Sequence, residues 1–135
     1  MSVSYADPEP NGLASLVGGL IEGNLAMHPA RVDLLRPARI DLEGLDAGVA
    51  IALRFGAGSV EVANGPSPRP HLAIAADAAA LLDLARAPLR LGFPDPFHAD
   101  GRAVLVGLLR GDLRVRGLLR HPIRLARFSR LLSVA

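Results

Sequence analysis

The sequence predicts an α+β domain in which a five-stranded, mainly antiparallel sheet carries four to five helices on one face. Five short runs alternate apolar with small or polar residues, which is typical of strands with one buried face. Other segments repeat apolar residues every third and fourth position, which is typical of amphipathic helices. The 135 residues are 50% hydrophobic, enough for one core. We expect one domain over residues 11–135, preceded by a disordered lead-in over residues 1–10.

The first helix is predicted over residues 11–27. Asn11 is a suitable N-cap, because its side chain can accept a hydrogen bond from a free backbone amide of the first turn. His28-Pro29 ends the helix, since the residue before a proline avoids the α conformation. A short helical turn is expected at 31–35. The residues with helical spacing are Leu13, Leu16, Val17, Leu20, Asn24 and Met27.

Four strands follow, each with one apolar face. Gly56-Ala57-Gly58 predicts a hairpin turn between the second and third strands, because glycine adopts positive φ at little cost. Residues 64–70 contain three prolines and predict a stiff loop between the third and fourth strands. The apolar positions of these strands are Ile40 and Leu42; Val49, Ile51, Leu53 and Phe55; Val60 and Val62; and Leu72 and Ile74.

The next segment is predicted to be mainly helical. Asp77 is expected to cap a helix over 78–86. An ordered loop over 88–100, with three prolines and two phenylalanines, leads to a further helix over 101–110.

The chain then forms its last strand and last helix. Leu113 and Val115 alternate with charged residues in the fifth strand, which Gly117 closes. A final helix is predicted over 121–134, with apolar residues on one face and arginines on the other.

Charge is distributed unevenly. All fifteen cationic side chains are arginine, and the formal net charge is +2. The missing lysine indicates the coding bias of a GC-rich bacterial genome. Residues 1–100 carry seven Arg and twelve acids, a net charge of −5, whereas residues 101–135 carry eight Arg and one acid, a net charge of +7. The C-terminal quarter therefore presents a cationic surface.

Several classes of function are excluded by what the sequence lacks. It has no cysteine, which fits a cytoplasmic location, and its first residues are acidic rather than typical of a signal peptide. No serine lies in a G-x-S-x-G motif. The histidines share no metal-ligand spacing. We therefore expect no enzyme activity, no metal and no cofactor.

Two weaker signals point to other chemistry. Asp95, His98 and Asp100 lie close together in a loop and could hold a metal or move a proton. Asp100, however, is well placed to cap the following helix. Arg114 and Arg116 could contact nucleic-acid phosphates, but no aromatic residue accompanies them for base stacking, so nucleic acid is not an expected partner.

Three blocks in fixed order resemble the sterol carrier protein type-2, or sterol-binding domain, family. They are Pro70–Asp77, a strand ending in an acid-capped helix; Ala80–Arg86, that helix; and Gly111–Arg120, a glycine-bracketed last strand leading to a terminal helix. The hairpin over 49–65 falls where the family has its central hairpin. The resemblance covers roughly residues 11–135. It implies an apolar tunnel between sheet and helices that binds a sterol, fatty acid or fatty acyl-CoA.

The sequence supplies large apolar residues for such a tunnel, although the same residues could simply fill the core. The run over 89–97 departs from the family pattern and reshapes the tunnel mouth, so the ligand stays open. An alternative function is a protein-interaction module that uses its apolar helix face for homodimerisation or for docking to a partner enzyme; monomer and homodimer both stay open. The expected ligand contacts are Leu81, Leu84, Phe93, Phe97, Leu105, Leu108, Leu109, Leu125, Phe128 and Leu132.

A carrier of lipids must also contact membranes. Arg120, Arg124 and Arg127 are spaced to share one face of the last helix. Basic groups near an anionic bilayer contribute about 1 kcal/mol each, which suits transient association. We expect these arginines to form that contact, whereas the alternative is a merely solvated face.

Overall fold

The computed structural model describes residues 3–46, 48–77, 79–80, 89–90, 93–94, 113–117 and 120–133. Its elements, in chain order, are β1 (Val3–Tyr5), α1 (Gly12–Met27), the 3-10 helix η1 (Pro29–Leu34), β2 (Ala38–Gly44), β3 (Val49–Gly56), β4 (Ser59–Asn64), β5 (Leu72–Ala76), β6 (Leu89–Arg90), β7 (Phe93–Pro94), β8 (Leu113–Arg116) and α4 (Pro122–Leu132).

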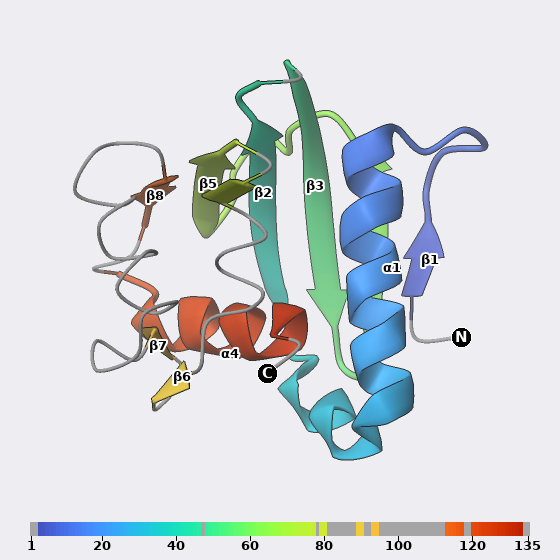
Figure 1. Cartoon of the computed structure of the whole chain (residues 1–135), viewed down its shortest axis with the longest axis vertical. Helices are drawn as coiled ribbons and strands as arrows, with labels where there is room; N and C mark the ends of the chain where they lie inside the picture. The colour runs from blue at the N-terminus through green and yellow to red at the C-terminus, as the bar shows by residue number, and fades with distance from the viewer. Residues whose placement is uncertain are drawn as a thin grey trace.

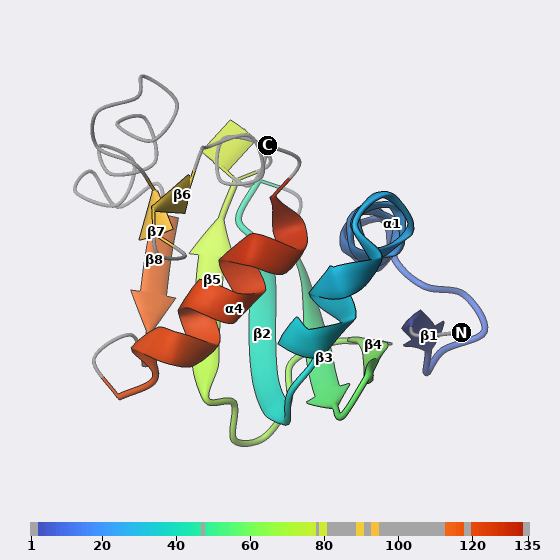
Figure 2. The ribbon, with the colours of Figure 1, turned by 90° about the horizontal axis from the view of Figure 1, so that it is seen from below.

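In the described part of the chain, the main sheet has six strands in the order β1-β4-β3-β2-β5-β8 (Figures 1 and 2). The β1–β4 and β2–β5 pairs are parallel, whereas β2–β3, β3–β4 and β5–β8 are antiparallel. The mainly antiparallel sheet expected from the sequence is confirmed, with one strand more than expected. A separate two-stranded ribbon pairs β6 with β7.

The additional strand lies in the segment that was expected to be disordered. Val3 of β1 is buried and stands opposite Val60 of β4. The Asn64 amide donates to Asp7 Oδ2 at 2.7 Å, and the Asn64 side chain donates to the Glu9 carbonyl at 3.1 Å. Pairing with β4 therefore orders a segment that has no periodicity of its own.

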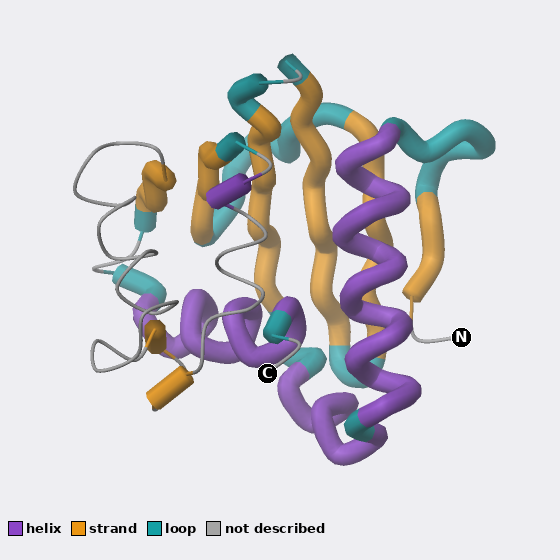
Figure 3. Tube along the Cα trace, in the orientation of Figure 1, coloured by secondary structure: helices purple, strands orange, loops and turns teal. Residues whose placement is uncertain are grey.

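The described helices lie together on one face of the sheet, so the described part of the chain forms two layers (Figure 2). Figure 3 shows α1 running alongside β3 and α4 crossing the lower part of the sheet. The largest fully buried side chains come from both layers and form one core. They are Phe128, Ile21, Leu35, Ile40, Leu42, Ile51, Leu53, Leu72, Ile74, Leu131, Leu132 and Val17.

Side-chain hydrogen bonds fix the ends of the helices. Asn11 accepts from the Ala14 amide at 2.8 Å, so the predicted N-cap of α1 is confirmed. The terminal carbonyls of a helix have no partner within it. At the end of α4, the buried Asn24 of α1 donates to the Leu131 carbonyl at 2.7 Å, and Arg31 of η1 donates to the Ser133 carbonyl at 2.6 Å. These two bonds tie α4 to the helical segment that packs beside it.

The predicted helices over 78–86 and 101–110 lie largely outside the described residues. The described start of the first one fits its expected cap, because Asp77 accepts from the Ala80 amide at 2.8 Å. The Asp95, His98 and Asp100 cluster also lies outside the described residues. Among the helices that the structure describes, none has the length and apolar character needed to cross a membrane.

Candidate functional site

The inner face of α4 carries three of the predicted ligand contacts. Phe128 and Leu132 are each 1% exposed, and Leu125 packs half-buried against the same core. The ring of Phe128 meets that of Phe55 on β3 edge to face, with centroids 6.1 Å apart. This geometry is favourable for aromatic pairs, and it fixes α4 on the sheet. All three residues thus face the interior between helix and sheet.

At the η1 end of α4 this interior is closed. The residual cavity there measures about 10 Å³. This is close to the smallest volume that holds one water molecule, so Phe128 acts here as a core residue. The cavity is lined by Leu34, Arg36, Ala38, Ile40, Phe55, Arg124, Arg127, Phe128 and Leu131.

Toward β8 the apolar surface is less completely covered. Val115 of β8, Leu125 of the first half of α4, and Ala80 are all half-buried while packing against the core. Figure 2 shows α4 starting near β8 and running across β5 toward β2. The β8 end of the helix–sheet interface is therefore one place where apolar surface remains partly accessible; Leu20, Leu25, Leu34 and Val49 are half-buried against other parts of the core.

The other predicted ligand contacts cannot be placed in this interior. Phe93 belongs to β7, and nothing is described of its side chain. The remaining six lie outside the described residues: Leu81, Leu84, Phe97, Leu105, Leu108 and Leu109.

The three arginines of the expected membrane face differ in their surroundings. Arg120 is exposed, whereas Arg127 and Arg124 are half-buried. Arg124 precedes Phe128 by four residues, so both fall on the inward side of the helix. It donates to His121 Nδ1 at 2.7 Å, and its buried Nε has no partner in the described part of the chain. Arg124 therefore belongs partly to the packing of α4 rather than to a solvent-facing stripe.

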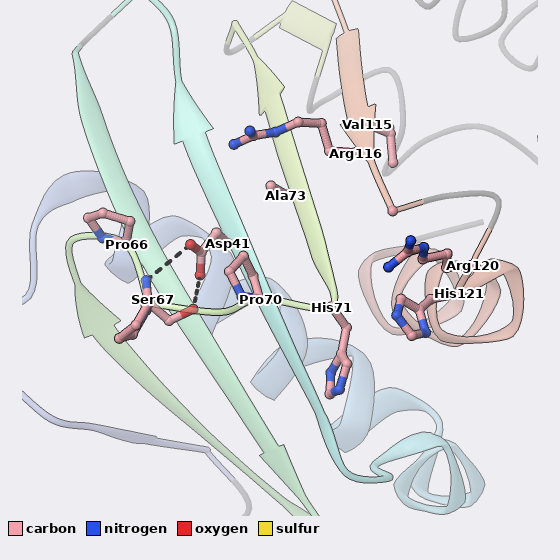
Figure 4. A pocket seen from close by; sticks show the side chains of 12 residues that line it. Asp41, Pro66, Ser67, Pro70, His71, Ala73, Val115, Arg116, Arg120 and His121 are labelled. Carbon is pink, nitrogen blue, oxygen red and sulfur yellow. Dashed lines mark hydrogen bonds between the residues drawn. The ribbon is translucent and has the colours of Figure 1, made fainter.

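The opposite face of the sheet is uncovered by the described helices and is hollowed. A groove of about 860 Å³ lies over β2, β5 and β8 and is bounded by the proline-rich loop (Figure 4). A second hollow of about 470 Å³ adjoins it and shares Asp41, Pro66, Ala73 and Arg116. We call the larger one the open-face groove. Its lining residues are Asp41, Pro66, Ser67, Pro68, Pro70, His71, Ala73, Val115, Arg116, Gly117, Arg120 and His121.

One wall of the open-face groove is held by a carboxylate. Asp41 of β2 is 9% exposed, and its two oxygens accept from the Ser67 hydroxyl at 2.7 Å and the Ser67 amide at 3.0 Å. Figure 4 shows both bonds. They satisfy a largely buried charge and fasten the loop over the sheet, as buried polar groups require.

Two imidazoles lie at the other end of the groove. The rings of His71 and His121 meet edge to face with centroids 5.0 Å apart. The Arg39 amide donates to His71 Nδ1 at 2.9 Å, and the Arg124 guanidinium donates to His121 Nδ1. Because amides and guanidinium groups can only donate, both Nδ1 atoms act as acceptors and the ring proton of each lies on Nε2.

The electrostatic surroundings favour the neutral form of His71. Burial lowers the pKa of His71 below its ordinary value, and electrostatic interaction with Arg124, Arg39 and His121 lowers it further. A protonated ring would also lose its bond from the Arg39 amide.

Sequence reasoning did not find the open-face groove. Its polar residues come from β2, the 64–70 loop, β5, β8 and the start of α4, with no shared local motif. The only signal was the high arginine content of the C-terminal quarter. Among the described residues, no group of three or more histidines or acids is arranged to hold a metal ion.

In the described part of the chain these features define a class: an α+β protein whose sheet has one apolar face covered by helices and one polar, hollowed face. We then compared the fold with solved structures. The chain is similar to a solved structure named "UbiJ-SCP2 Ubiquinone synthesis protein", with a TM-score of 0.60, 19% sequence identity, and coverage of 89% of this chain and 92% of that chain. The fold is thus that of a sterol-carrier-protein-2-like domain, as the sequence resemblance implied. No family model and no curated protein matches the sequence.

Proposed function

We propose that the protein binds an apolar, lipid-like ligand in an internal tunnel between its helices and its sheet, and that it performs no chemical step. The observation that carries this proposal is the sterol-carrier-protein-2-like fold, which extends over 89% of the chain. Sterols, fatty acids and fatty acyl-CoA are the ligand classes that the resemblance implies. We place this activity in the cytoplasm, in keeping with a sequence that has no cysteine.

We infer the entrance for such a ligand from the packing of the described interior. Because the η1 end of α4 leaves only about 10 Å³, a lipid must be accommodated elsewhere. The half-buried Val115, Leu125 and Ala80 offer apolar contact at the β8 end. Burying apolar surface of the ligand there would contribute about 25 cal/mol per Å². We infer that the tunnel begins beside Leu125.

The similar solved structure adds a ligand class to test. Its name describes it as a ubiquinone synthesis protein. Ubiquinone carries a long apolar chain, so a prenylated quinone or its precursor suits the same kind of tunnel. We therefore include prenylated quinones beside sterols and fatty acids as ligands of this chain.

The test is native mass spectrometry of the purified protein, followed by organic extraction and identification of any released lipid. We expect a retained lipid, or saturable binding of at least one of oleate, cholesterol and a short-chain ubiquinone. Leu125→Glu should weaken binding at least tenfold, because a carboxylate at the tunnel entrance would meet apolar ligand surface. Ile123→Glu, a change at a 70% exposed position of the same helix, is the matched control. Absence of any lipid and of any binding would refute the proposal.

We further propose that basic residues of α4 bring the carrier to anionic membranes transiently. Arg120 and Arg127 carry this proposal better than Arg124, whose guanidinium is bonded to His121. In vesicle sedimentation, the double change to glutamine should reduce binding to anionic vesicles but not to neutral ones. Arg54→Gln, an exposed position on β3, is the control. Equal sedimentation of the double variant and the wild type would leave these arginines as solvating groups.

A second candidate function is an interaction module, and the exposed apolar residues of the helical layer favour it. Met27 is 77% exposed and Ile123 is 70% exposed. An interface that covers either side chain would remove exposed apolar surface from water. Light scattering distinguishes the candidates: a stable dimer that dissociates on Met27→Lys or Ile123→Lys and binds no lipid supports this module, whereas a monomer with bound lipid supports the carrier.

A further inference from the structure

The open-face groove contains positive charge that the described structure leaves unpaired. Arg116 and Arg120 both line it, both are exposed, and neither makes a hydrogen bond or ion pair with the described residues. Figure 4 shows Arg116 extending from β8 across Ala73 toward β2, and Arg120 lying beside His121 at the start of α4. The two guanidinium groups are thus presented over one hollow.

Neutral donors accompany these charges. His71 and His121 line the same groove, and each carries its ring proton on Nε2 because its Nδ1 is already an acceptor. Asp41 is the acid among the lining residues, and both its oxygens are occupied by Ser67. The charged groups of the lining therefore leave a net positive charge with the histidines neutral.

We propose that the open-face groove binds a phosphate-bearing molecule, with Arg120 and the two imidazoles at one end of the groove and Arg116 nearer β2 supplying the positive charge and the hydrogen-bond donors. A guanidinium group binds two phosphate oxygens at once in bidentate geometry. A carboxylate can pair in the same way, but its two oxygens serve only one guanidinium, whereas a phosphate has further oxygens for a second donor. The volume of about 860 Å³ lies within the range of small-molecule sites and exceeds what a free phosphate needs.

The rest of the lining indicates the body of that molecule. Pro66, Pro68 and Pro70 form one wall, with Ala73 also lining the groove. A ligand with an anionic end and a less polar body fits a groove that has arginines and histidines in one part and prolines in another. The shared chemistry is a phosphate ester, borne either by a dissolved molecule or by a lipid headgroup. The proposal is independent of lipid binding in the interior, because the groove lies on the opposite face of the sheet.

The test uses inorganic pyrophosphate as the soluble probe, measured by isothermal titration calorimetry on the full chain at low salt. We expect saturable binding that weakens about tenfold or more in Arg116→Gln and in Arg120→Gln. Arg130→Gln removes an exposed arginine of α4 outside the groove and should bind like the wild type. No binding of any phosphate probe, or equal affinity in all four proteins, would overturn the proposal.

A second arm separates the two sources of phosphate. Vesicles of phosphatidylcholine with and without phosphatidic acid are sedimented with the same four proteins. Binding to phosphatidic acid that is lost in both groove variants and kept in Arg130→Gln assigns the site to a lipid headgroup. Pyrophosphate binding without such vesicle binding assigns it to a dissolved phosphate ester.

NMR titration of His71 measures whether pyrophosphate binds beside its ring. The measured quantity is the change in the pKa of His71 when pyrophosphate is added. The groups facing this ring are Arg124, Arg39 and His121, with Arg116, Arg120 and Asp41 lining the same groove. A bound anion offsets the positive charges around the ring, so pyrophosphate should raise the pKa of His71 in the wild type and in Arg130→Gln. The rise should be absent in Arg116→Gln and Arg120→Gln; a rise of equal size in all four proteins would contradict the site.

Discussion

The two faces of the sheet are built from alternate residues of the same strands, yet they have opposite properties. On β2, Ile40 and Leu42 are each 1% exposed beneath the helices, whereas Arg39 and Glu43 on the other face are exposed. Strand residues point alternately to the two faces, so one sequence run supplies both surfaces. The helix-covered face is apolar and, near η1, filled; the open face is polar and hollowed.

This difference separates stability from ligand binding. Side chains of the covered face contribute most to the free energy of unfolding, because they bury apolar area. The basic side chains of the open face are exposed, and changes at such positions have small effects on stability. Residues of the open face can therefore be changed to test ligand binding with little effect on the free energy of unfolding.

The largest expected effect contrasts one residue from each face. Phe128→Ala should lower the free energy of unfolding by about 3–5 kcal/mol, because it removes a buried ring that packs on Phe55. Arg116→Gln, on the open face, should change it by less than about 0.5 kcal/mol. Chemical denaturation of both variants checks this, and similar losses in the two would contradict the division between the faces.

The next effect concerns the glycine that ends β8. Gly117 has φ of +89°, and a Cβ there would run into the backbone carbonyl of His71. Gly117→Ala should therefore cost about 3 kcal/mol, from backbone strain and displacement of β5. Gly58→Ala is the matched control, since its φ is +76° but a Cβ there meets open space. It should cost about 1 kcal/mol. Equal thermal stability of the two variants would argue against the close packing at Gly117.

A smaller effect tests the polar bond within the covered layer. Asn24→Ala should cost about 1–3 kcal/mol, because the carbonyl of Leu131 would be left buried without its donor. Urea denaturation measures the loss. Asn24→Asp should be no better than alanine, since a carboxylate cannot donate at neutral pH. Wild-type stability in Asn24→Ala would show that the link between α1 and α4 contributes little.

The smallest effect is a pH dependence from the open face. The pKa of His71 is lowered in the folded protein, so the unfolded chain binds a proton more readily. Stability from this group is complete above the ordinary histidine pKa of about 6.5 and is lost as pH falls through the lower folded value. His71→Asn keeps a side-chain acceptor and should flatten this dependence. Denaturation at several pH values from about 5 to 8 measures it, and an unchanged slope in the variant would assign the dependence to other groups.

The alternation of apolar residues was sufficient to predict β2 to β5 and β8. Asn11 and Asp77 were recognised as caps because a cap is a local interaction. β1 was missed, since three residues without periodicity are ordered only by pairing with β4. Arg124 was predicted to face solvent because it is charged. Its spacing of four residues from the buried Phe128 would have placed it on the inward side of the helix.

The open-face groove was beyond sequence reasoning for a different reason. His71 and His121 are fifty positions apart, and the antiparallel pairing of β5 with β8 is among the contacts that bring their surroundings together. The predicted ligand contacts Leu125, Phe128 and Leu132 do face the interior. Whether they contact a ligand depends on volume, which a pattern of residue types does not specify.

The most direct measurement of the central claim is paramagnetic NMR with a doxyl-labelled fatty acid. If the lipid enters the helix-covered interior at the β8 end, the signals of Leu125 should broaden at low ligand ratios. Signals of Glu43 and Arg54, on the open face, should stay sharp. Broadening confined to open-face residues, or none at saturating fatty acid, would contradict a lipid site between the helices and the sheet.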